Sequence, residues 1–360
     1  MKRIPPNPLT EPLHQSTQPP TAASLEEVQP VQEIAQKLID KLADLPDGDL
    51  VGQMVETSLK LLRDKTNRGD LKLTNQAFKE MRYALKVFSP YRTTRKVSIF
   101  GSARTAETHP DYAQAAAFGR AMAQAGWMVI TGAGGGIMAA GHGGGGPDAS
   151  FGLAIRLPFE QATNLTITND PKLIHFKYFF TRKLMFVRFS DAIAAFPGGF
   201  GTMDEGFEVL TLVQTGKSIP MPIVLIDSPG GGYWDAWQDY VKNQLLGRGL
   251  VGQEDLHLYK ITTSAEEAAA EIQHFYSNYH SIRFTRDDLV VRLRRAPSER
   301  QLDKIAGEFA DISSDGFRIG PALPIERDEP DLAAMPRLIF NFNRRDHGRL
   351  RLLINELNGF

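Results

Sequence analysis

The chain has 360 residues, of which 42% are hydrophobic and 23% charged, a composition typical of a folded globular protein and incompatible with disorder throughout. Lysine and arginine number 41 against 42 acidic residues, so the net charge is −1 and a general coat for nucleic acid is disfavoured. With no cysteine, the sequence excludes disulfides, thiolate zinc sites, iron–sulfur clusters and a cysteine nucleophile.

The N-terminal part of the chain divides into two segments. Residues 1–23 are rich in proline, glutamine and threonine without hydrophobic periodicity, which predicts a disordered tail. Residues 24–91 carry apolar side chains at helical spacing and predict a helical N-terminal segment. The sequence shows neither the apolar core of a secretory signal nor an apolar run long enough to span a membrane, so we expect a cytoplasmic protein.

The rest of the chain alternates between strands and helices. In residues 92–282, short apolar strands such as KVSIF and WMVIT are separated by helical segments. This alternation predicts an α/β domain, a Rossmann-like doubly wound parallel sheet covered by helices on both faces. Residues 283–360 predict a small α+β unit in the order β-α-β-β-α, with strands expected at 288–294, 317–323 and 337–343.

Three glycine-containing segments follow predicted strands: Gly101–Arg104, Gly132–Met138 and Pro197–Thr202. Ligands bind at the carboxyl ends of the strands in an open parallel sheet, where glycines let backbone N–H groups approach a phosphate. A tight turn explains any one such loop equally well, but three together favour a phosphorylated small ligand.

Two other glycine features predict local structure only. The run GHGGGG, residues 141–146, predicts a flexible or close-packed connection in which His142 is incidental. Gly216, followed by Lys217 and Ser218, resembles the end of a phosphate-binding P-loop but lacks its upstream glycine, so we interpret it as a helix C-terminal glycine.

Two further motifs carry a family resemblance. Arg182 and Lys183, followed downstream by PGGFGTMDE from Pro197 to Glu205, resemble the paired signature of the Lonely-guy (LOG) family, an Arg-Lys on a helix and PGGxGTxxE at a strand end. Its members are nucleoside 5′-monophosphate phosphoribohydrolases, including cytokinin-activating enzymes and bacterial nucleotide nucleosidases, and similar sequences were formerly labelled possible lysine decarboxylases. The resemblance covers about residues 95–250.

The resemblance implies a role for each matching residue. Arg182 and Glu205 would form the catalytic pair, with Lys183 beside them in the site. The 5′-phosphate would lie on the loop formed by Gly198, Gly199, Gly201 and Thr202. Further substrate-binding positions would be Gly101, Ser102, Gly134, Gly135, Gly136, Glu160 and Thr211.

Elementary chemistry agrees with these roles. Hydrolysis of an N-glycosidic bond passes through an oxocarbenium-like ribose. A nearby carboxylate can stabilise that cation or activate the water that attacks it. Glu205 follows a phosphate-binding helix start by about one turn, and the Arg182 guanidinium suits a phosphate or the leaving base. Each residue also has a structural interpretation: Thr202 and Glu205 fit a helix capping box, and Arg182 fits a solvated helical charge.

The predicted function is hydrolysis of an AMP-like nucleoside 5′-monophosphate to free base and ribose 5-phosphate. No cofactor is expected, and no metal, because no histidine has a partner at metal-ligand spacing. The alternatives are a non-catalytic nucleotide sensor or cofactor carrier on the same fold, and a pyridoxal-phosphate lysine decarboxylase using Lys183. The resemblance also implies a homodimer or higher homo-oligomer, and we expect neither nucleic acid nor a membrane as partner.

Overall fold

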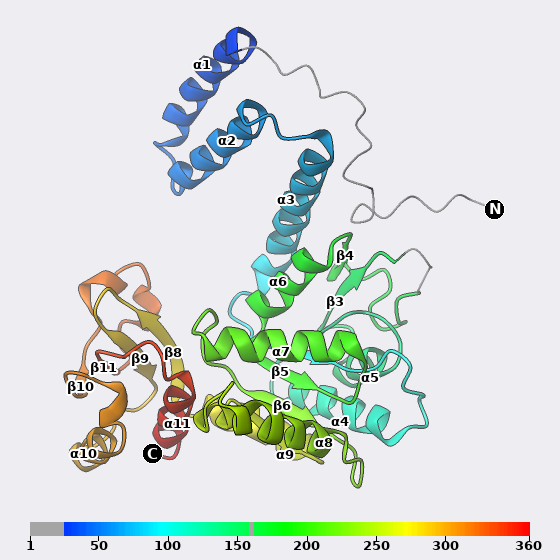
Figure 1. Cartoon of the computed structure of the whole chain (residues 1–360), viewed down its shortest axis with the longest axis vertical. Coiled ribbons are helices and arrows are strands. Elements are labelled where there is room, and N and C mark those ends of the chain that lie inside the picture. Colours follow the sequence, from blue (N-terminus) through cyan, green and yellow to red (C-terminus); the bar gives the residue numbers. More distant parts are fainter. Residues whose placement is uncertain (1–24, 158–161) are drawn as a thin grey trace. The chain divides into compact units, whose positions relative to one another are not determined.

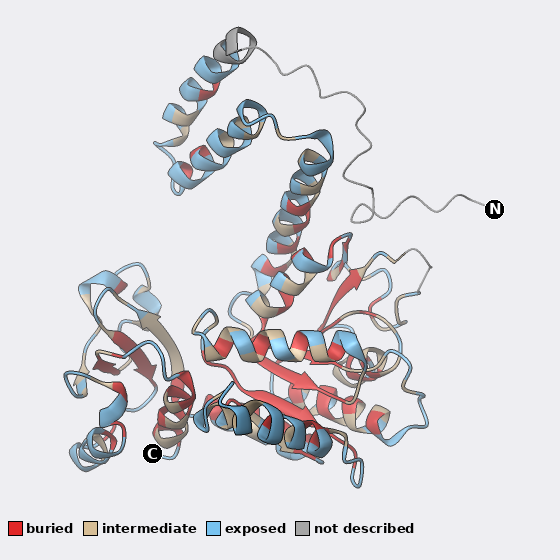
Figure 2. Cartoon of the chain, viewed as in Figure 1, coloured by how far each residue is buried: buried red, intermediate tan, exposed pale blue. Residues whose placement is uncertain are grey.

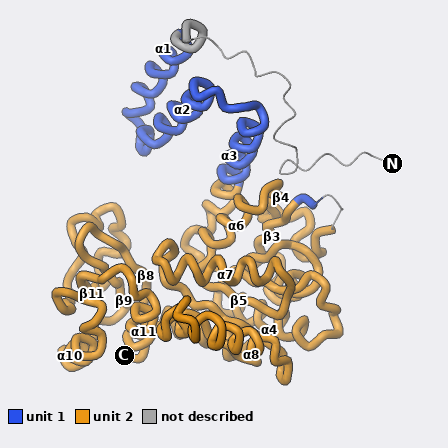
Figure 3. Tube along the Cα trace, in the orientation of Figure 1, with its two compact units in different colours: residues 1–83, 156–160 blue, residues 84–155, 161–360 orange. Residues whose placement is uncertain are grey.

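The computed structural model describes residues 25–157 and 162–360 (Figure 1). The predicted disordered tail, residues 1–23, and the predicted site residue Glu160 lie outside the described residues. The chain divides into two compact units, which Figure 3 colours separately: residues 1–83 with 156–160, and residues 84–155 with 161–360.

The first unit is helical in its described part. Its helices are α1 (Leu25–Leu42), α2 (Gly48–Arg63) and α3 (Arg68–Phe88), the last of which continues into the second unit. The chain reverses between α1 and α2 at a tight turn where Gly48 is required, because a Cβ there would lie 1.7 Å from the carbonyl oxygen of Leu42.

The second unit contains the predicted doubly wound parallel sheet, which is confirmed. Its seven strands among the described residues are all parallel and run in the order β4-β3-β2-β1-β5-β6-β7. Figure 2 shows most of these strands as buried, as expected where helices cover both faces of a sheet. The strands are β1 (Lys96–Phe100), β2 (Met128–Thr131), β3 (Ser150–Ile155), β4 (Leu173–Phe176), β5 (Ala192–Ala195), β6 (Ile223–Ile226) and β7 (Tyr259–Thr262).

The strand order reverses at β1, whose neighbours are β2 on one side and β5 on the other. Right-handed crossovers on either side of this point place the helices that follow β1 and β5 on opposite faces of the sheet. The carboxyl ends of β1 and β5 therefore form the switch point at which such sheets bind ligands. The helices are α4 (Pro110–Gln124), α5 (Ile137–Gly145), α6 (Phe179–Phe189), α7 (Phe200–Gln214), α8 (Tyr233–Tyr240) and α9 (Ala265–Phe275).

The glycine run at residues 141–146 forms most of the second half of helix α5 and packs closely against α4. A Cβ on Gly144 would lie 2.0 Å from the carbonyl oxygen of Ala116, and one on Gly119 would lie 2.3 Å from that of Gly141. The predicted connection is therefore wrong, because these residues are helical, but the predicted close packing is observed.

The C-terminal part contains an antiparallel sheet with one strand more than predicted. The order is β10-β11-β9-β8, and β8 directly follows α9 and forms a hairpin with β9. Strand β8 crosses the boundary predicted at residue 282, because its half-buried, mixed sequence YHSIRF lacks a clear strand pattern. The elements are β8 (Tyr279–Phe284), β9 (Leu289–Leu293), α10 (Glu299–Glu308), β10 (Arg318–Gly320), β11 (Arg337–Phe340) and α11 (His347–Asn358).

Helix α11 joins the two sheets. Buried side chains of α11, such as Leu353, belong to the same hydrophobic cluster as Phe275 of α9 and Ile226 of β6. The C-terminal sheet therefore shares one continuous core with the parallel sheet, which explains why both fall in the same compact unit.

Candidate active site

The three predicted glycine loops meet at the switch point. The backbone N–H of Ser102, after β1, donates to the carbonyl oxygen of Pro197, after β5, at 3.1 Å. The carbonyl oxygen of Ser102 in turn accepts from the N–H of Ile137, at the start of α5, at 3.0 Å. Two hydrogen bonds on one residue thus connect all three loops.

Some of the loop glycines are required by this close packing. A Cβ on Gly198 would lie 2.2 Å from the hydroxyl oxygen of Thr202, and one on Gly101 would lie 2.6 Å from the side chain of Ile137. Gly136 has a φ of +59°, and its Cβ would lie 2.3 Å from the carbonyl oxygen of Ser102. These glycines let the loops approach each other, whatever ligand binds.

Two glycines at the start of α7 differ from the others. No described atom outside the local backbone lies within 4 Å of the position a Cβ would take on Gly199 or on Gly201. Among the described residues, no side chain caps the N-terminus of α7, which begins at Phe200 after Gly199. A helix N-terminus carries partial positive charge, so this open position suits an anion.

The capping-box interpretation of Thr202 and Glu205 is wrong. Because α7 begins at Phe200, Thr202 is its third residue rather than its cap, and Glu205 is its sixth. The Glu205 side chain therefore lies beyond the helix start and has no capping role.

Glu205 is a buried carboxylate with an unfilled bonding site. It is 5% exposed, and within the described part of the chain its Oε2 atom has no hydrogen-bond partner. Burial raises the pKa of Glu205 above its usual value; Lys183 and Arg182 oppose this rise, while the nearby carboxylates of Glu208 and Asp204 add to it. A carboxylate in this environment is a stronger base than one in water.

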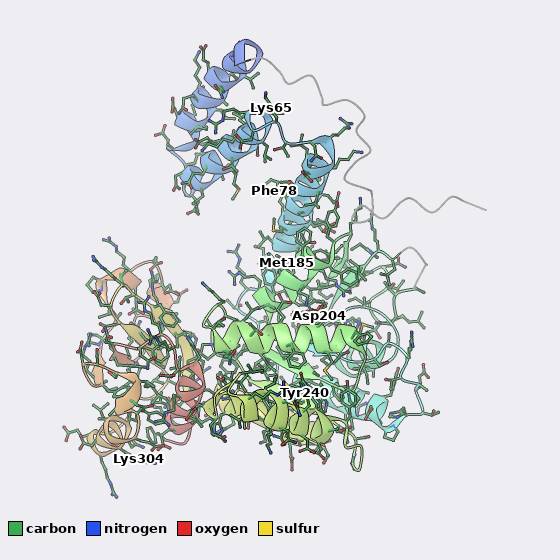
Figure 4. All side chains as sticks on the ribbon, viewed as in Figure 1. Lys65, Phe78, Met185, Asp204, Tyr240 and Lys304 are labelled. Carbon is green, nitrogen blue, oxygen red and sulfur yellow. The ribbon has the colours of Figure 1, made fainter. Side chains whose placement is uncertain are left out.

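Lys183 extends from α6 to α7 and forms ion pairs with three carboxylates. Its Nζ atom lies 2.6 Å from Glu208, 2.8 Å from Asp204 and 3.4 Å from the Oε2 atom of Glu205. Figure 4 labels Asp204 on α7, and Met185 on α6 two residues beyond Lys183. Burial lowers the pKa of Lys183, but the carboxylates outweigh it, so the pKa lies above its usual value.

Arg182, the residue before Lys183 on α6, contacts two aromatic rings and the second glycine loop. Its guanidinium carbon is 5.1 Å from the ring centre of Phe179 and 5.7 Å from that of Phe186, and its Nη1 atom lies beside Gly132 in the second glycine loop. Burial lowers the pKa of Arg182, and the charge of Glu205 opposes that shift. Its Nε atom is buried without a hydrogen-bond partner among the described residues.

Three other predicted positions lie further from this cluster or contact only neighbouring loops. The Thr211 hydroxyl is exposed and donates to the carbonyl oxygen of Phe207 at 2.7 Å, about 9 Å along the helix axis from Glu205. Gly135 is exposed and only in ordinary contact with Ala103, and Gly134 packs against the side chain of Met138.

The sequence-based prediction missed a fourth glycine loop at the same edge of the sheet. The Tyr233 hydroxyl donates to the carbonyl oxygen of Gly198 at 2.5 Å. The Asp227 carboxylate, buried after β6, accepts the backbone N–H groups of Tyr233 at 2.7 Å and Trp234 at 3.2 Å. The glycine run at residues 230–232, which follows the predicted strand PIVLI, was the signal that would have revealed this support.

The expectation that His142 is incidental is wrong. This buried side chain lies 3.1 Å from the Thr131 hydroxyl and 2.9 Å from the carbonyl oxygen of Phe151 through its Nε2 atom. On its other side it meets Asn164, whose amide donates to the carbonyl oxygen of Gly134 at 3.0 Å. Burial lowers the pKa of His142, which is therefore a neutral support for the second glycine loop.

Neither a cluster that could hold a metal ion nor a helix that could span a membrane is present among the described residues. Within residues 25–157 and 162–360, no three His, Asp or Glu side chains are grouped so that they would hold a metal ion. In the same residues, no helix combines the length and apolar character needed to cross a membrane.

Comparison with known proteins agrees with the family signature. A family model described as "Possible lysine decarboxylase" matches residues 136–272. Cytokinin riboside 5′-monophosphate phosphoribohydrolase LOG of Oryza sativa subsp. japonica is 26% identical over 99 residues, which are 27% of this chain and 39% of that protein. The resemblance to the Lonely-guy family is confirmed. The corresponding LOG1 protein of Arabidopsis thaliana is 26% identical over 101 residues, 28% of this chain and 46% of that protein, so the alignments span less than half of either relative.

Several solved structures are similar to about half of this chain. The molybdenum cofactor binding protein of Rippkaea orientalis is 19% identical, with a TM-score of 0.36, and the match covers 50% of this chain and 96% of that one. The molybdenum cofactor carrier protein of Chlamydomonas reinhardtii is 20% identical, with a TM-score of 0.35 and the same coverage. DNA processing protein A of Helicobacter pylori is 15% identical, with a TM-score of 0.32, covering 51% of this chain and 81% of that one. Such likeness carries no function from those proteins to this chain.

Proposed function

We propose that this protein hydrolyses the N-glycosidic bond of an AMP-like nucleoside 5′-monophosphate to free base and ribose 5-phosphate. The observation that carries this proposal is Glu205, a buried carboxylate without a hydrogen-bond partner among the described residues, behind an uncapped helix N-terminus. The names of the two plant relatives, both cytokinin riboside 5′-monophosphate phosphoribohydrolases, support the same reaction class.

The phosphate would bind at the N-terminus of α7. The backbone at Gly199 and Gly201 is open on the side where a Cβ would lie, so a phosphate oxygen can approach the N–H groups closely. Tyr233 holds the carbonyl oxygen of Gly198 and so fixes the orientation of this loop. Binding energy gained at the phosphate, remote from the bond that breaks, then positions the ribose.

Glu205 would act on the ribose that extends from this phosphate. As the bond between C1′ and the base nitrogen breaks, its electron pair leaves with the base and the sugar becomes an oxocarbenium-like cation. The ionised carboxylate stabilises that cation, and water adds to C1′ while its proton passes to Glu205. Transfer of one proton to the departed base nitrogen gives the neutral free base and restores the Glu205 carboxylate. The raised pKa of Glu205 makes its carboxylate a better acceptor for this proton.

Arg182 would bind the substrate beside Glu205. Its buried Nε atom lacks a partner in the described part of the chain, and a guanidinium donates readily to phosphate and hydroxyl oxygens. The charge of Arg182 also opposes the rise in the pKa of Glu205 and so favours the ionised carboxylate.

The decarboxylase alternative does not suit this site. A lysine that forms a Schiff base needs a lowered pKa, whereas the three carboxylates around Lys183 raise its pKa. A non-catalytic nucleotide sensor or carrier would have no use for a buried carboxylate at the sugar, and the turnover assay separates it from the enzyme.

The test is chromatography of a panel of nucleoside 5′-monophosphates, AMP included, after incubation with the protein. We expect one or more to release free base and an equal amount of ribose 5-phosphate. Thermal stabilisation by a nucleotide without release of any base would instead support the carrier function. The homo-oligomeric state and cytoplasmic location implied earlier stay predictions, which light scattering and cell fractionation would test.

A further inference from the structure

Lys183 has unequal contacts with its three carboxylates. The two short ion pairs, at 2.6 Å to Glu208 and 2.8 Å to Asp204, lie at ordinary contact distance, whereas the 3.4 Å to Glu205 is longer than a normal hydrogen bond. The Lys183 side chain is 16% exposed, and its ammonium lies closer to the first two carboxylates than to Glu205.

We propose that Asp204 and Glu208 are positioning residues that hold the Lys183 ammonium off Glu205, so that the Oε2 atom of Glu205 stays available to the substrate. This rests on the proposed function, because the nucleotide is the molecule that would use that atom. It also assigns Lys183 a place in the support of Glu205 rather than a direct bond to the phosphate.

The two holding residues differ in strength. The Asp204 side chain is 64% exposed, so water screens its attraction for the ammonium. The Glu208 side chain is 32% exposed, so water screens its attraction for the ammonium less. Its contact with Lys183 is an ion pair without hydrogen-bond geometry, since its Oε2 atom has no hydrogen-bond partner among the described residues. The charged groups acting on Glu205 are Lys183 and Arg182 on α6 and Glu208 and Asp204 on α7.

Removing Glu208 would let Lys183 move onto Glu205. A closer ammonium stabilises the ionised carboxylate, and loss of the Glu208 charge removes a repulsion, so both effects lower the pKa of Glu205. A carboxylate with a lower pKa and a filled Oε2 atom is a weaker base, which slows the chemical step without weakening phosphate binding.

The first test is the pH profile of Glu208→Gln. We expect the acid limb of kcat/KM to move to lower pH and kcat on the plateau to fall about 10-fold, with KM within about twofold of wild type. Asp235→Asn, a neutralised exposed carboxylate on α8, is the matched control and should change neither value. A raised KM with an unmoved acid limb would show that Glu208 contacts the substrate and would overturn the proposal.

The second test needs no activity. Thermal denaturation at pH 8 compares the change in Tm caused by Glu205→Gln in the wild-type background and in the Glu208→Gln background. If Lys183 is held off Glu205, Glu205→Gln should raise Tm in the wild-type background. In the Glu208→Gln background, where Lys183 has paired with Glu205, the same substitution should raise Tm less or lower it. Equal changes in both backgrounds would overturn the proposal.

The two failures are distinguishable. A wild-type protein that releases base from no nucleotide would refute the proposed function. The Tm comparison would still measure whether Lys183 pairs with Glu205 or with Asp204 and Glu208. Lys183→Met adds a further check, because loss of a phosphate ligand would raise KM and leave Tm unchanged. Loss of the holding cluster would instead lower Tm, because Lys183 forms short ion pairs with Asp204 and Glu208.

Discussion

Substitution of Gly199 by alanine tests whether the N-terminus of α7 holds the phosphate. No described atom outside the local backbone lies within 4 Å of the added Cβ, and φ of −87° with ψ of −159° is an extended conformation that alanine adopts without strain. The substitution therefore leaves folding intact. The new methyl group can affect only a molecule that occupies the open position.

The expected effects on stability and on catalysis have opposite signs. A glycine replaced by alanine at a compatible position stabilises a protein by about 0.4–1 kcal/mol, mainly through the unfolded chain. If the methyl group displaces a phosphate oxygen from one backbone N–H, the loss is that of a hydrogen bond to a charged group, about 1.5–3 kcal/mol. Because every 1.4 kcal/mol is tenfold, kcat/KM should fall about 10- to 150-fold.

The assay is release of free base from the best nucleotide, alongside thermal denaturation with and without ribose 5-phosphate. Gly201→Ala should behave like Gly199→Ala, since its Cβ position is equally open. Gly206→Ala, also open but more than one turn further along α7, is the matched control and should gain stability without losing kcat/KM. Unchanged kcat/KM and unchanged ribose 5-phosphate binding in Gly199→Ala and Gly201→Ala would refute a phosphate at this helix N-terminus.

Three further substitutions test the support of the site. Glu205→Gln should slow base release by about 10²- to 10⁴-fold, measured in single-turnover reactions. Since burial raises the pKa of Glu205, its ionised form opposes folding above that pKa, so the same variant should gain Tm at pH 8 and gain little below the pKa of an unfolded glutamate. Tyr233→Phe removes the hydroxyl group that donates to Gly198. Loss of that hydrogen bond, worth about 0.5–1.5 kcal/mol, should lower kcat/KM, with little change in far-UV circular dichroism. His142→Ala removes a hydrogen-bond partner of Asn164, of the Thr131 hydroxyl and of the Phe151 carbonyl oxygen, and should cost about 1–3 kcal/mol in urea denaturation. An unchanged midpoint would contradict the supporting role.

The sequence predicted the parallel sheet because its strands are short apolar runs separated by helices, a pattern that few other folds produce. The same pattern placed the glycine loops at one edge, since the carboxyl ends of parallel strands point the same way. It failed at β8, where the alternation of buried and exposed residues is weak and the strand follows α9 almost directly. Pairing with β9 stabilises that strand, and a partner strand is not visible in local sequence.

The site was predictable in part. Residue types and spacing indicated a phosphate loop, but the pairing of Arg182 with Glu205 came from the family resemblance, because contact between α6 and α7 depends on tertiary packing. The capping-box interpretation failed because Gly199, not Thr202, is the N-cap of α7: its carbonyl oxygen accepts the N–H groups of Thr202 and Met203. The support by His142 depends likewise on packing between separate loops.

The unfilled polar atoms of the site lead to one more prediction. Within the described residues, the Oε2 atom of Glu205 and the Nε atom of Arg182 are buried without hydrogen-bond partners, and each such group costs about 1–3 kcal/mol. Inorganic phosphate fills the helix N-terminus alone, whereas the hydroxyl groups of ribose 5-phosphate can also donate to Glu205. Ribose 5-phosphate should therefore raise Tm more than phosphate at equal saturation, and Glu205→Leu should remove most of that difference. Equal stabilisation of the wild type by both ligands would mean that Glu205 does not face the sugar. The proposed reaction would then have no carboxylate to accept the proton of water.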